Sequence, residues 1–325
     1  MNRKQLGKVI YVCISLLLVL VILYSGLRIL ESAVFLHQRP EIQTTSKTIV
    51  RDGVKYYPRQ DITTVLMMGI NQRGKVVPTE YNVGGAADMV TLFVFDEKTE
   101  ECVILSINRD LMVQMPALNE YGKEVGTYYG QLAFSHTYGD GMEDSCKNVR
   151  AAVSNLLYGT QIDYYFSMNM DAIALLNDAV GGVTVTIRDD FSQVDPELSK
   201  GSVTLFGEHA VNFVQARWDV GDELNLSRME RHKEYMSNFV PALREKMESS
   251  VGFVVDTYDA VSDYIVTDCS AQTVSRLEQE YSDYAVGETL TIQGENVLGE
   301  EYYEFYADEE ALDELILRLF FAPKE

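Results

Sequence analysis

The chain has 325 residues and a formal net charge of −22, with 49 acidic residues against 27 basic ones. That length accommodates a membrane segment together with one large domain or two small ones. Because five of the basic residues but only one acidic residue precede Pro40, the rest of the chain is more acidic still. An acidic surface repels nucleic acid, whose binding requires basic side chains to neutralise phosphates. We therefore expect no nucleic-acid partner.

The N-terminal segment has the pattern of a membrane anchor. Three basic residues lie within the first eight positions, and the 19 residues Val9–Leu27 that follow carry no charge. At about 1.5 Å per helical residue, such a segment is long enough to cross a bilayer core. A cleaved signal peptide is the alternative, although its apolar region usually holds only about 7 to 15 residues. Since basic residues stay in the cytoplasm, we predict a cytoplasmic segment 1–8, a transmembrane anchor 9–30 in the cell membrane and an extracytoplasmic remainder.

Cysteine and histidine spacing gives no sign of a zinc or thiol centre. Cys13 lies in the predicted anchor, and Cys102, Cys146 and Cys269 show no CxxC spacing. One disulfide among the last three is an alternative, although isolated cysteines are more often buried apolar residues. The four histidines are not at zinc-ligand spacing. The G-x-S-x-G, H-E-x-x-H and Walker motifs are also missing, so nothing supports nucleophilic or zinc hydrolysis.

The segment after the anchor divides into a linker and a domain. Residues 31–60 are predicted to form a stalk with a short hairpin at the turn signal Asp52-Gly53. Residues 61–325 are predicted to form the extracytoplasmic domain. Its first part contains three short, almost continuously apolar runs, which are typical of central strands covered on both faces: Ile62–Ile70, Met89–Phe95 and Cys102–Ile107. The polar "DEKTE" between the last two predicts a hairpin.

Helical and strand periodicities alternate through the rest of the domain. The pattern predicts helices at 143–159, 171–180, 207–217, 227–247, 259–266, 271–281 and 308–320, strands at 162–169 and 183–187, and a strand and turn at 288–295. Pro241 is a point of disturbance in the fourth of these helices. The alternation predicts an α/β fold with a mixed central β-sheet between helical layers.

The helix in "NLSRMERHKEY" has an unusual cationic start. With Ser227 as its N-cap, Arg228 falls in the first turn, and Arg231 and His232 follow on nearly the same face. Positive side chains at a helix N-terminus oppose the helix dipole unless an anion binds there. A phosphate would reverse that cost, because backbone N–H groups and arginines all direct donors at it. Pairing of these arginines with Glu230 and Glu234 on a solvated surface is an equally weighted alternative.

Other charged side chains lie at the ends of predicted elements, where α/β folds place ligand sites. Arg109 and Asp110 follow a strand, and Arg217 ends a helix, where a cation is favourable on its own account. Asp88 follows "NVGGAA" and begins a strand. Its carboxylate is a candidate ligand for a hard cation, although an isolated aspartate at this place is more often a turn residue.

The order of several motifs resembles the LytR-CpsA-Psr family. The resemblance covers roughly residues 60–240 through "VLMMGINQRG", "ADMVTLFVFDEKTEECVILSINRDLMV", "LLYGTQIDYYFSMNMDAIALLNDAVGGVTVTI", "LFGEHAVNFVQAR" and "NLSRMERHKEYM". It implies a membrane-anchored enzyme of Gram-positive bacteria. Such an enzyme transfers a glycopolymer, such as teichoic acid or capsular polysaccharide, from an undecaprenyl-pyrophosphate carrier to peptidoglycan. It also implies an apolar tunnel for the polyprenyl chain and an Mg²⁺-assisted pyrophosphate site lined with arginines.

Position by position, the resemblance assigns roles to residues of this chain. Asp88 resembles a catalytic, magnesium-binding aspartate, and Arg109 a catalytic arginine that also binds pyrophosphate. Arg217, Arg228 and Arg231 resemble further pyrophosphate-binding arginines.

The chain also departs from the family pattern. Asn71 stands where many members have a second metal-binding aspartate, and it offers magnesium an oxygen without charge. Gln215 and His232 replace an arginine and a glutamine, Ala86 an arginine, and Asn108 a proline. The resulting hypothesis is a glycopolymer phosphotransferase. The alternatives are a polyprenyl-pyrophosphate-binding regulatory or scaffold protein with weakened catalysis, and an anchored protein that contacts other wall enzymes without binding lipid.

Overall fold

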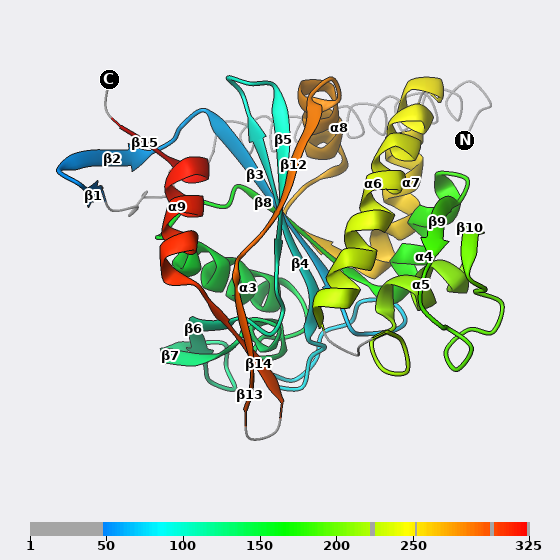
Figure 1. Ribbon diagram of the computed structural model, residues 1–325, viewed down its shortest axis with the longest axis horizontal. Helices are drawn as coiled ribbons and strands as arrows, with labels where there is room; N and C mark the ends of the chain where they lie inside the picture. The colour runs from blue at the N-terminus through cyan, green and yellow to red at the C-terminus, as the bar shows by residue number, and fades with distance from the viewer. Residues whose placement is uncertain (1–47, 222–224, 251, 300–301, 324–325) are drawn as a thin grey trace, which may run out of the picture. The chain divides into compact units, whose positions relative to one another are not determined.

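A six-stranded mixed sheet forms the centre of the computed structural model, which describes residues 48–221, 225–250, 252–299 and 302–323 (Figure 1). Its strand order is β11-β8-β3-β4-β5-β12, with β8/β3 and β5/β12 parallel and the other neighbours antiparallel. These pairings confirm the predicted mixed sheet and the hairpin of β4 and β5. The predicted cytoplasmic segment 1–8 and anchor 9–30 lie outside the described residues. In the described part of the chain, no helix has the length and apolar character needed to cross a bilayer.

The strands of the central sheet are β3 (Ile62–Ile70), β4 (Ala87–Asp96), β5 (Glu101–Ile107), β8 (Tyr164–Asn169), β11 (Ile265–Thr267) and β12 (Ala285–Thr291). The strands outside it are β1 (Ile49–Arg51), β2 (Val54–Pro58), β6 (Met112–Leu118), β7 (Glu124–Gln131), β9 (Val183–Ile187), β10 (Gly201–Leu205), β13 (Gly294–Leu298), β14 (Tyr303–Ala307) and β15 (Phe321–Pro323). The helices are α2 (Phe134–Thr137), α3 (Glu143–Leu156), α4 (Met170–Ala179), α5 (Glu208–Gln215), α6 (Asn225–Ser249), α7 (Phe253–Val261), the 3-10 turn η1 (Ser262–Tyr264), α8 (Ala271–Tyr281) and α9 (Glu309–Phe320).

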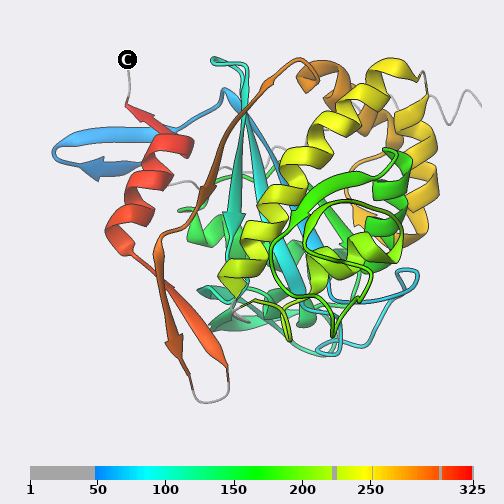
Figure 2. The same cartoon turned by 45° about the vertical axis from the view of Figure 1, so that its right-hand side comes forward.

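The two faces of the sheet have different neighbours because side chains alternate along a strand. Leu66, Met68 and Ile70 of β3 belong to one core with α3 and α9. Met67 and Gly69, between them in sequence, line a cavity that is closed by α4, α5 and α6. Figures 1 and 2 show α6 along one side of the sheet, and α3 and α9 on the other. The sheet therefore separates an apolar core from a layer that contains a hollow.

The predicted hairpin at Asp52-Gly53 is part of the folded domain. Strands β1 and β2 pair antiparallel across this turn, where both residues have positive φ. Strand β2 also pairs with β15 at the other end of the chain. Residues 49–58, predicted as part of a stalk, are therefore joined to the C-terminal end of the described domain.

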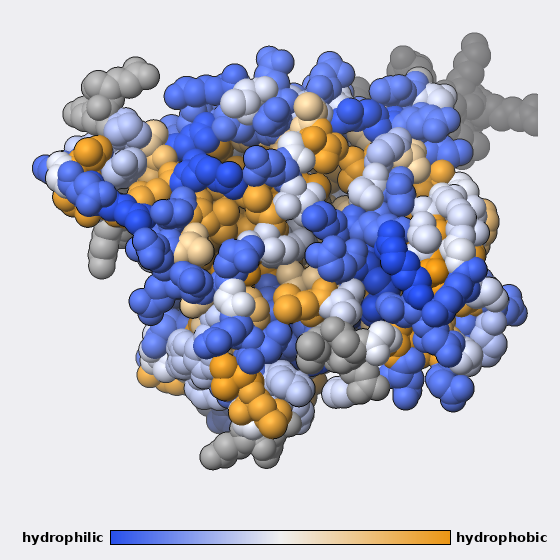
Figure 3. Space-filling model, viewed as in Figure 1, coloured by the Kyte–Doolittle hydropathy of each residue, from blue (hydrophilic) through white to orange (hydrophobic). Residues whose placement is uncertain are grey.

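One expectation for the elements was wrong, and two hairpins were not predicted. The predicted helix at 259–266 ends as α7 at Val261, and Ile265 and Val266 belong to β11, where they pair with β8. Both residues are β-branched, and a free sheet edge next to β8 favours them as a strand. The hairpins β6–β7 and β13–β14 were not predicted. The face in Figure 3 is mostly hydrophilic, but apolar side chains are exposed on β13–β14, where Leu298 is 70 % exposed.

Candidate functional site

Asp88 reaches the cavity face through a β-bulge. Gly69 pairs with Met89 and Ile70 pairs with Ala87, so Asp88 is an extra residue between two paired positions of β4. Bulges of this kind redirect a side chain and are common beside active sites. Asp88 is 9 % exposed and lines the cavity together with Met89. The local backbone thus turns a carboxylate toward a pocket that is otherwise apolar.

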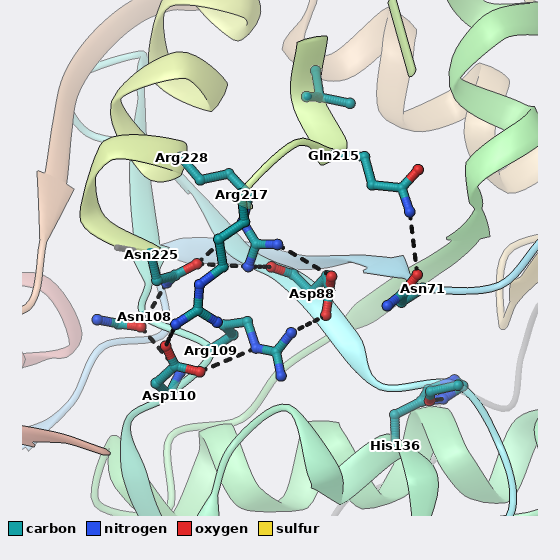
Figure 4. A network of polar contacts seen from close by, with 12 residues as sticks. Asn71, Asp88, Asn108, Arg109, Asp110, His136, Gln215, Arg217, Asn225 and Arg228 are labelled. Carbon is teal, nitrogen blue, oxygen red and sulfur yellow. Dashed lines mark hydrogen bonds and ion pairs between the residues drawn. The ribbon is translucent and has the colours of Figure 1, made fainter. Parts of the chain in front are cut away.

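Arg109 and Arg228 bind the two oxygens of the Asp88 carboxylate (Figure 4). Arg109 Nη1 donates to Oδ1, and Arg228 Nη1 donates to Oδ2 at 3.2 Å. Arg228 Nη2 also donates to Asn225 Oδ1 at 2.6 Å, one turn earlier in α6. Arg228 is 3 % exposed, and this burial lowers its pKa to about 10. The side chain remains a cation at neutral pH.

Asp110 connects Arg217 to the cluster of Asp88, Arg109 and Arg228. Its Oδ1 lies 3.2 Å from Arg109 Nε, and its Oδ2 lies 3.6 Å from Arg217 Nη2. Burial raises the Asp110 pKa, while the charges of Arg109, Arg217 and Arg228 act in the opposite direction. Among the described residues, three guanidinium groups therefore surround two carboxylates in a chain of net charge −22.

Asn108 explains how the loop after β5 is held. Its Oδ1 accepts hydrogen bonds from the Asp110 backbone N–H at 3.0 Å and from Asn225 Nδ2 at 2.6 Å. The first bond is a local side-chain turn of the kind that asparagine favours. The second ties the loop to the start of α6. An asparagine in place of the family proline thus fixes Arg109 and Arg228 relative to each other.

Arg231 and His232 contact the end of a neighbouring helix. Arg231 donates to the carbonyl oxygens of Phe213 and Ala216, and its Nη1 lies 3.6 Å from Asp189 Oδ2. His232 Nε2 lies 2.8 Å from the Val214 carbonyl oxygen. Orphan carbonyls at a helix C-terminus are favourable partners for such donors. These side chains cap α5 just before Arg217, whereas Arg109, Arg217 and Arg228 meet around Asp88 and Asp110.

Two details of the predicted helix start need correction. Ser227 is not the N-cap, because α6 already begins at Asn225 and Arg228 is its fourth residue. Glu234 does not pair with the arginines of this turn, because its carboxylate accepts from Arg188 and from the Thr186 backbone N–H. The cationic start of α6 is explained instead by Asp88 and by the α5 carbonyl groups.

The cavity beside the arginine cluster is lined almost entirely by apolar side chains. It has an empty volume of about 750 Å³, part of which is open to solvent. Ordinary ligand pockets are about 300–1,000 Å³. Its lining includes Met67, Met89, Met168, Met170, Ile173, Leu176, Val214, Tyr235, Met236 and Phe239. Methionine adapts its shape to irregular apolar surfaces. Asp88 and Arg228 are charged residues in this lining, so the hollow combines an apolar body with one charged wall.

Asn71 and Gln215, two of the departures from the family pattern, contact each other. Gln215 Nε2 donates to Asn71 Oδ1 at 3.3 Å (Figure 4). A magnesium ion at Asp88 and Asn71 would therefore share Asp88 with two guanidinium groups and take an uncharged oxygen that already accepts a hydrogen bond. The described residues contain no group of three or more Asp, Glu, His or Cys side chains arranged for a metal. They do not fit a preformed divalent-cation site, and the magnesium ion stays a prediction.

Some residues of the site could not be found by sequence reasoning. Asn108 was noted only as a departure, and Asn225 has no spacing signal. His136 of α2 is 1 % exposed, and its Nδ1 lies 2.7 Å from the Gly85 carbonyl oxygen in the loop before Asp88. Burial lowers its pKa to about 4. All three support the backbone from which the charged groups project.

The three cysteines of the domain fit the interpretation as buried apolar residues. Cys102, Cys146 and Cys269 are buried and free, and burial raises the pKa of each thiol to about 12. At neutral pH they are protonated and poorly nucleophilic.

Comparisons with known proteins agree with this fold. The LytR_cpsA_psr family model matches residues 26–319. The teichoic acid transferase TagU of Oceanobacillus iheyensis, named polyisoprenyl-teichoic acid–peptidoglycan teichoic acid transferase, is 25 % identical over 260 residues, which are 78 % of this chain and 74 % of TagU. TagT of Bacillus subtilis, named as the same kind of transferase, is 25 % identical over 269 residues, or 80 % of this chain and 77 % of TagT. A solved structure of TagT bound to LIIa-WTA has a TM-score of 0.59 and 22 % identity, and the alignment covers 80 % of this chain and 90 % of that one. The chain belongs to the LytR-CpsA-Psr family.

Proposed function

We propose that this chain is a transferase that attaches a cell-wall glycopolymer to peptidoglycan, and that its donor is carried on a polyprenyl diphosphate. The observation that carries the proposal is the apolar cavity with Asp88 and Arg228 in its wall. A prenyl chain suits the apolar part, and a diphosphate suits the guanidinium groups that gather at one end. The teichoic acid transferases among the relatives support the same conclusion.

A second cavity gives the lipid chain additional room. It has an empty volume of about 630 Å³ and lies between α6 and the sheet edge formed by β5 and β12. Met89, His232 and Met236 line both cavities. A flexible prenyl chain longer than the first cavity can therefore continue past these three side chains.

The arginine cluster suits a phosphoryl transfer. In the proposed reaction, an acceptor hydroxyl oxygen forms a bond to the glycan-linked phosphorus, and the bond from that phosphorus to the bridging oxygen breaks. The electron pair leaves with prenyl phosphate. Arg109, Arg217 and Arg228 stabilise the charge on the phosphate oxygens, since such reactions depend mainly on positioning and electrostatics. Asp88, a carboxylate of the cavity wall, is the proposed acceptor of the hydroxyl proton.

The proposal includes the location of the reaction. We propose that residues 9–30 anchor the chain in the cell membrane with the domain outside, where peptidoglycan is the acceptor. A carrier lipid and a wall acceptor then meet at the domain. Protease treatment of intact cells that carry a tag at residue 325 tests this orientation, because an extracytoplasmic tag is removed and a cytoplasmic tag is protected.

Turnover of a defined donor tests the activity. Full-length protein in detergent is incubated with a synthetic prenyl-diphosphate-linked disaccharide and peptidoglycan oligomers, and mass spectrometry follows prenyl phosphate release and the phosphodiester product. Arg109→Ala should lower the rate by roughly 100-fold, as expected when one transition-state donor is removed. The exposed surface variant Lys98→Ala should keep the native rate. Absence of product with a donor that a related transferase uses would overturn the proposal.

One observation favours a second candidate function, a prenyl-diphosphate-binding protein with little transfer activity. The neutral pair of Asn71 and Gln215 lies beside Asp88 (Figure 4), and Gln215 lines the cavity with Asp88 and Arg228. The family resemblance implies charged residues at both positions. Tight donor binding without product, unchanged in the variant Asn71→Asp/Gln215→Arg, would support that alternative over the transferase.

A further inference from the structure

Asn71 and Gln215 form a neutral pair that is fixed from both sides. Asn71 directly follows β3, and its backbone N–H donates to the Ala86 carbonyl oxygen at 2.9 Å, in the loop before Asp88. Gln215 is the last residue of α5 and lines the cavity. The hydrogen bond between the two amides therefore joins the exit of a central strand to the helix that leads to Arg217.

The same pair affects the charge that surrounds a bound anion. Both oxygens of Asp88 accept from guanidinium groups, and both oxygens of Asp110 lie near one. Among the described residues the cluster holds three guanidinium groups and two carboxylates, so a diphosphate finds arginine donors there without another ion. A divalent cation would be repelled by three arginines, and it prefers carboxylate oxygens to a single amide oxygen.

We infer that the arginine cluster binds a diphosphate without a divalent cation. Asn71 and Gln215 are the specificity-determining residues for this independence from a cation. The inference rests on the proposed function for the identity of the diphosphate ligand. The positive charge comes from Arg109, Arg217 and Arg228. The amide pair adds neither positive nor negative charge. Because both side chains are neutral amides, position 71 adds no second carboxylate beside Asp88, and position 215 adds no fourth arginine beside the cluster.

The effects of substitutions at positions 71 and 215 on diphosphate binding should depend on each other. Asn71→Asp places a second carboxylate near Asp88, which repels the diphosphate unless a cation binds between them. Gln215→Arg combined with Asn71→Asp restores the lost charge balance through an ion pair in place of the amide contact. The single variant should therefore require magnesium for diphosphate binding, and the double variant should require it less.

Chain-specific probes make the test direct. Trp218 is the only tryptophan of the chain, it is 65 % exposed, and the Arg217 guanidinium carbon lies 5.3 Å from the centre of its ring. Its fluorescence should report occupation of the arginine cluster. Full-length protein is titrated with geranylgeranyl diphosphate in EDTA and in excess magnesium, with isothermal titration calorimetry as a second readout. Binding of Mn²⁺ alone is followed by electron paramagnetic resonance.

The native protein should bind geranylgeranyl diphosphate with dissociation constants that agree within about threefold in EDTA and in magnesium, and it should not bind Mn²⁺. Asn71→Asp should bind the probe roughly tenfold more weakly in EDTA than in magnesium, a difference of about 1.4 kcal/mol, and it should gain a Mn²⁺ site. Asn119→Asp is the matched control. It adds the same charge at the β6–β7 turn, where Asn119 Oδ1 accepts from two backbone N–H groups as a carboxylate also can.

Binding of the probe by native protein only in magnesium would overturn the inference and leave the proposed function standing. A native Mn²⁺ site that is lost in Asp88→Asn would overturn it as well. No binding under either condition would count against the proposed function itself, and this inference would fall with it.

Discussion

Arg228 is a buried cation whose partners are all fixed by the fold. It is 3 % exposed and binds Asp88 and Asn225. We expect Arg228→Met to lower the free energy of unfolding by about 3 to 5 kcal/mol, because removal of one partner leaves a buried charge less compensated. The double variant Asp88→Asn/Arg228→Met should recover part of that loss, since it removes both charges. Urea unfolding measures both changes. A loss below about 1 kcal/mol in the single variant would contradict a strong buried pair.

His136 makes stability depend on pH. Its pKa is lowered from 6.5 in the unfolded chain to about 4 in the folded protein because the ring is buried. The unfolded chain therefore binds the proton more readily, and stability is lost as the pH falls from 6.5 toward 4. Between pH 7 and pH 5 this loss should amount to about 2 kcal/mol.

The variant His136→Asn isolates this contribution. The asparagine amide can reach the Gly85 carbonyl oxygen in the manner of Nδ1, and it does not titrate. Urea unfolding at pH 7 and pH 5 should show a smaller pH dependence in the variant by about 2 kcal/mol. Equal pH dependence in the two proteins would mean that His136 is not the group responsible.

At the scale of single residues, the sequence predicts the charged residues of the site but not its asparagines. Arg109, Arg217 and Arg228 were candidates because of their places at the ends of predicted elements, and the family resemblance assigned them to a pyrophosphate site. Asn108 and Asn225 were not, because an asparagine in a loop or at a helix start has many ordinary explanations. Their mutual hydrogen bond joins positions 117 residues apart and follows only from the packing of α6 against the loop after β5.

The junction of α5 and α6 depends on side chains that cap a helix from outside. Arg231 donates to two carbonyl groups at the end of α5 and is 7 % exposed. We expect Arg231→Met to lower the free energy of unfolding by roughly 1.5 to 3 kcal/mol, the range for hydrogen bonds that involve a charged group. It should also weaken prenyl diphosphate binding, because Arg217 directly follows the capped carbonyl of Ala216.

Glu245→Met is the control for this prediction, because Glu245 is an exposed residue of the same helix and lines neither cavity. Thermal or urea unfolding gives the stability, and Trp218 fluorescence gives the affinity. Stability loss without any change in affinity would show that the cap does not position Arg217.

Elements with strong periodicity were predicted well, and those that depend on partners were not. The apolar runs of β3, β4 and β5 and the amphipathic helices α3 and α9 follow from hydrophobic spacing alone. Strand β11 is three residues long and exists because β8 offers a free edge. The β-bulge at Asp88 was also missed, because its register is set by the pairing with β3 rather than by local sequence.

The two ends of the described domain stabilise each other. Phe321 of β15 is 4 % exposed and belongs to the core of the central sheet, while the same strand pairs with β2. We expect Phe321→Ala to lower the free energy of unfolding by about 3 to 5 kcal/mol, as is typical for loss of a buried phenylalanine. Val50→Ala in β1, where the side chain is 62 % exposed, should change it by less than about 0.5 kcal/mol. Similar effects of the two substitutions in urea unfolding would contradict the structure.

The pairing of β2 with β15 should allow the domain to be circularly permuted. Because the first hairpin and the last strand lie side by side, a short linker can connect residue 323 to residue 48 without disturbing either. New termini can then be opened at the tip of the β6–β7 hairpin, where Tyr121 is 81 % exposed. The six central strands, the cavity and the arginine cluster all remain uncut in such a circular permutant, so the domain should fold with its chain rearranged.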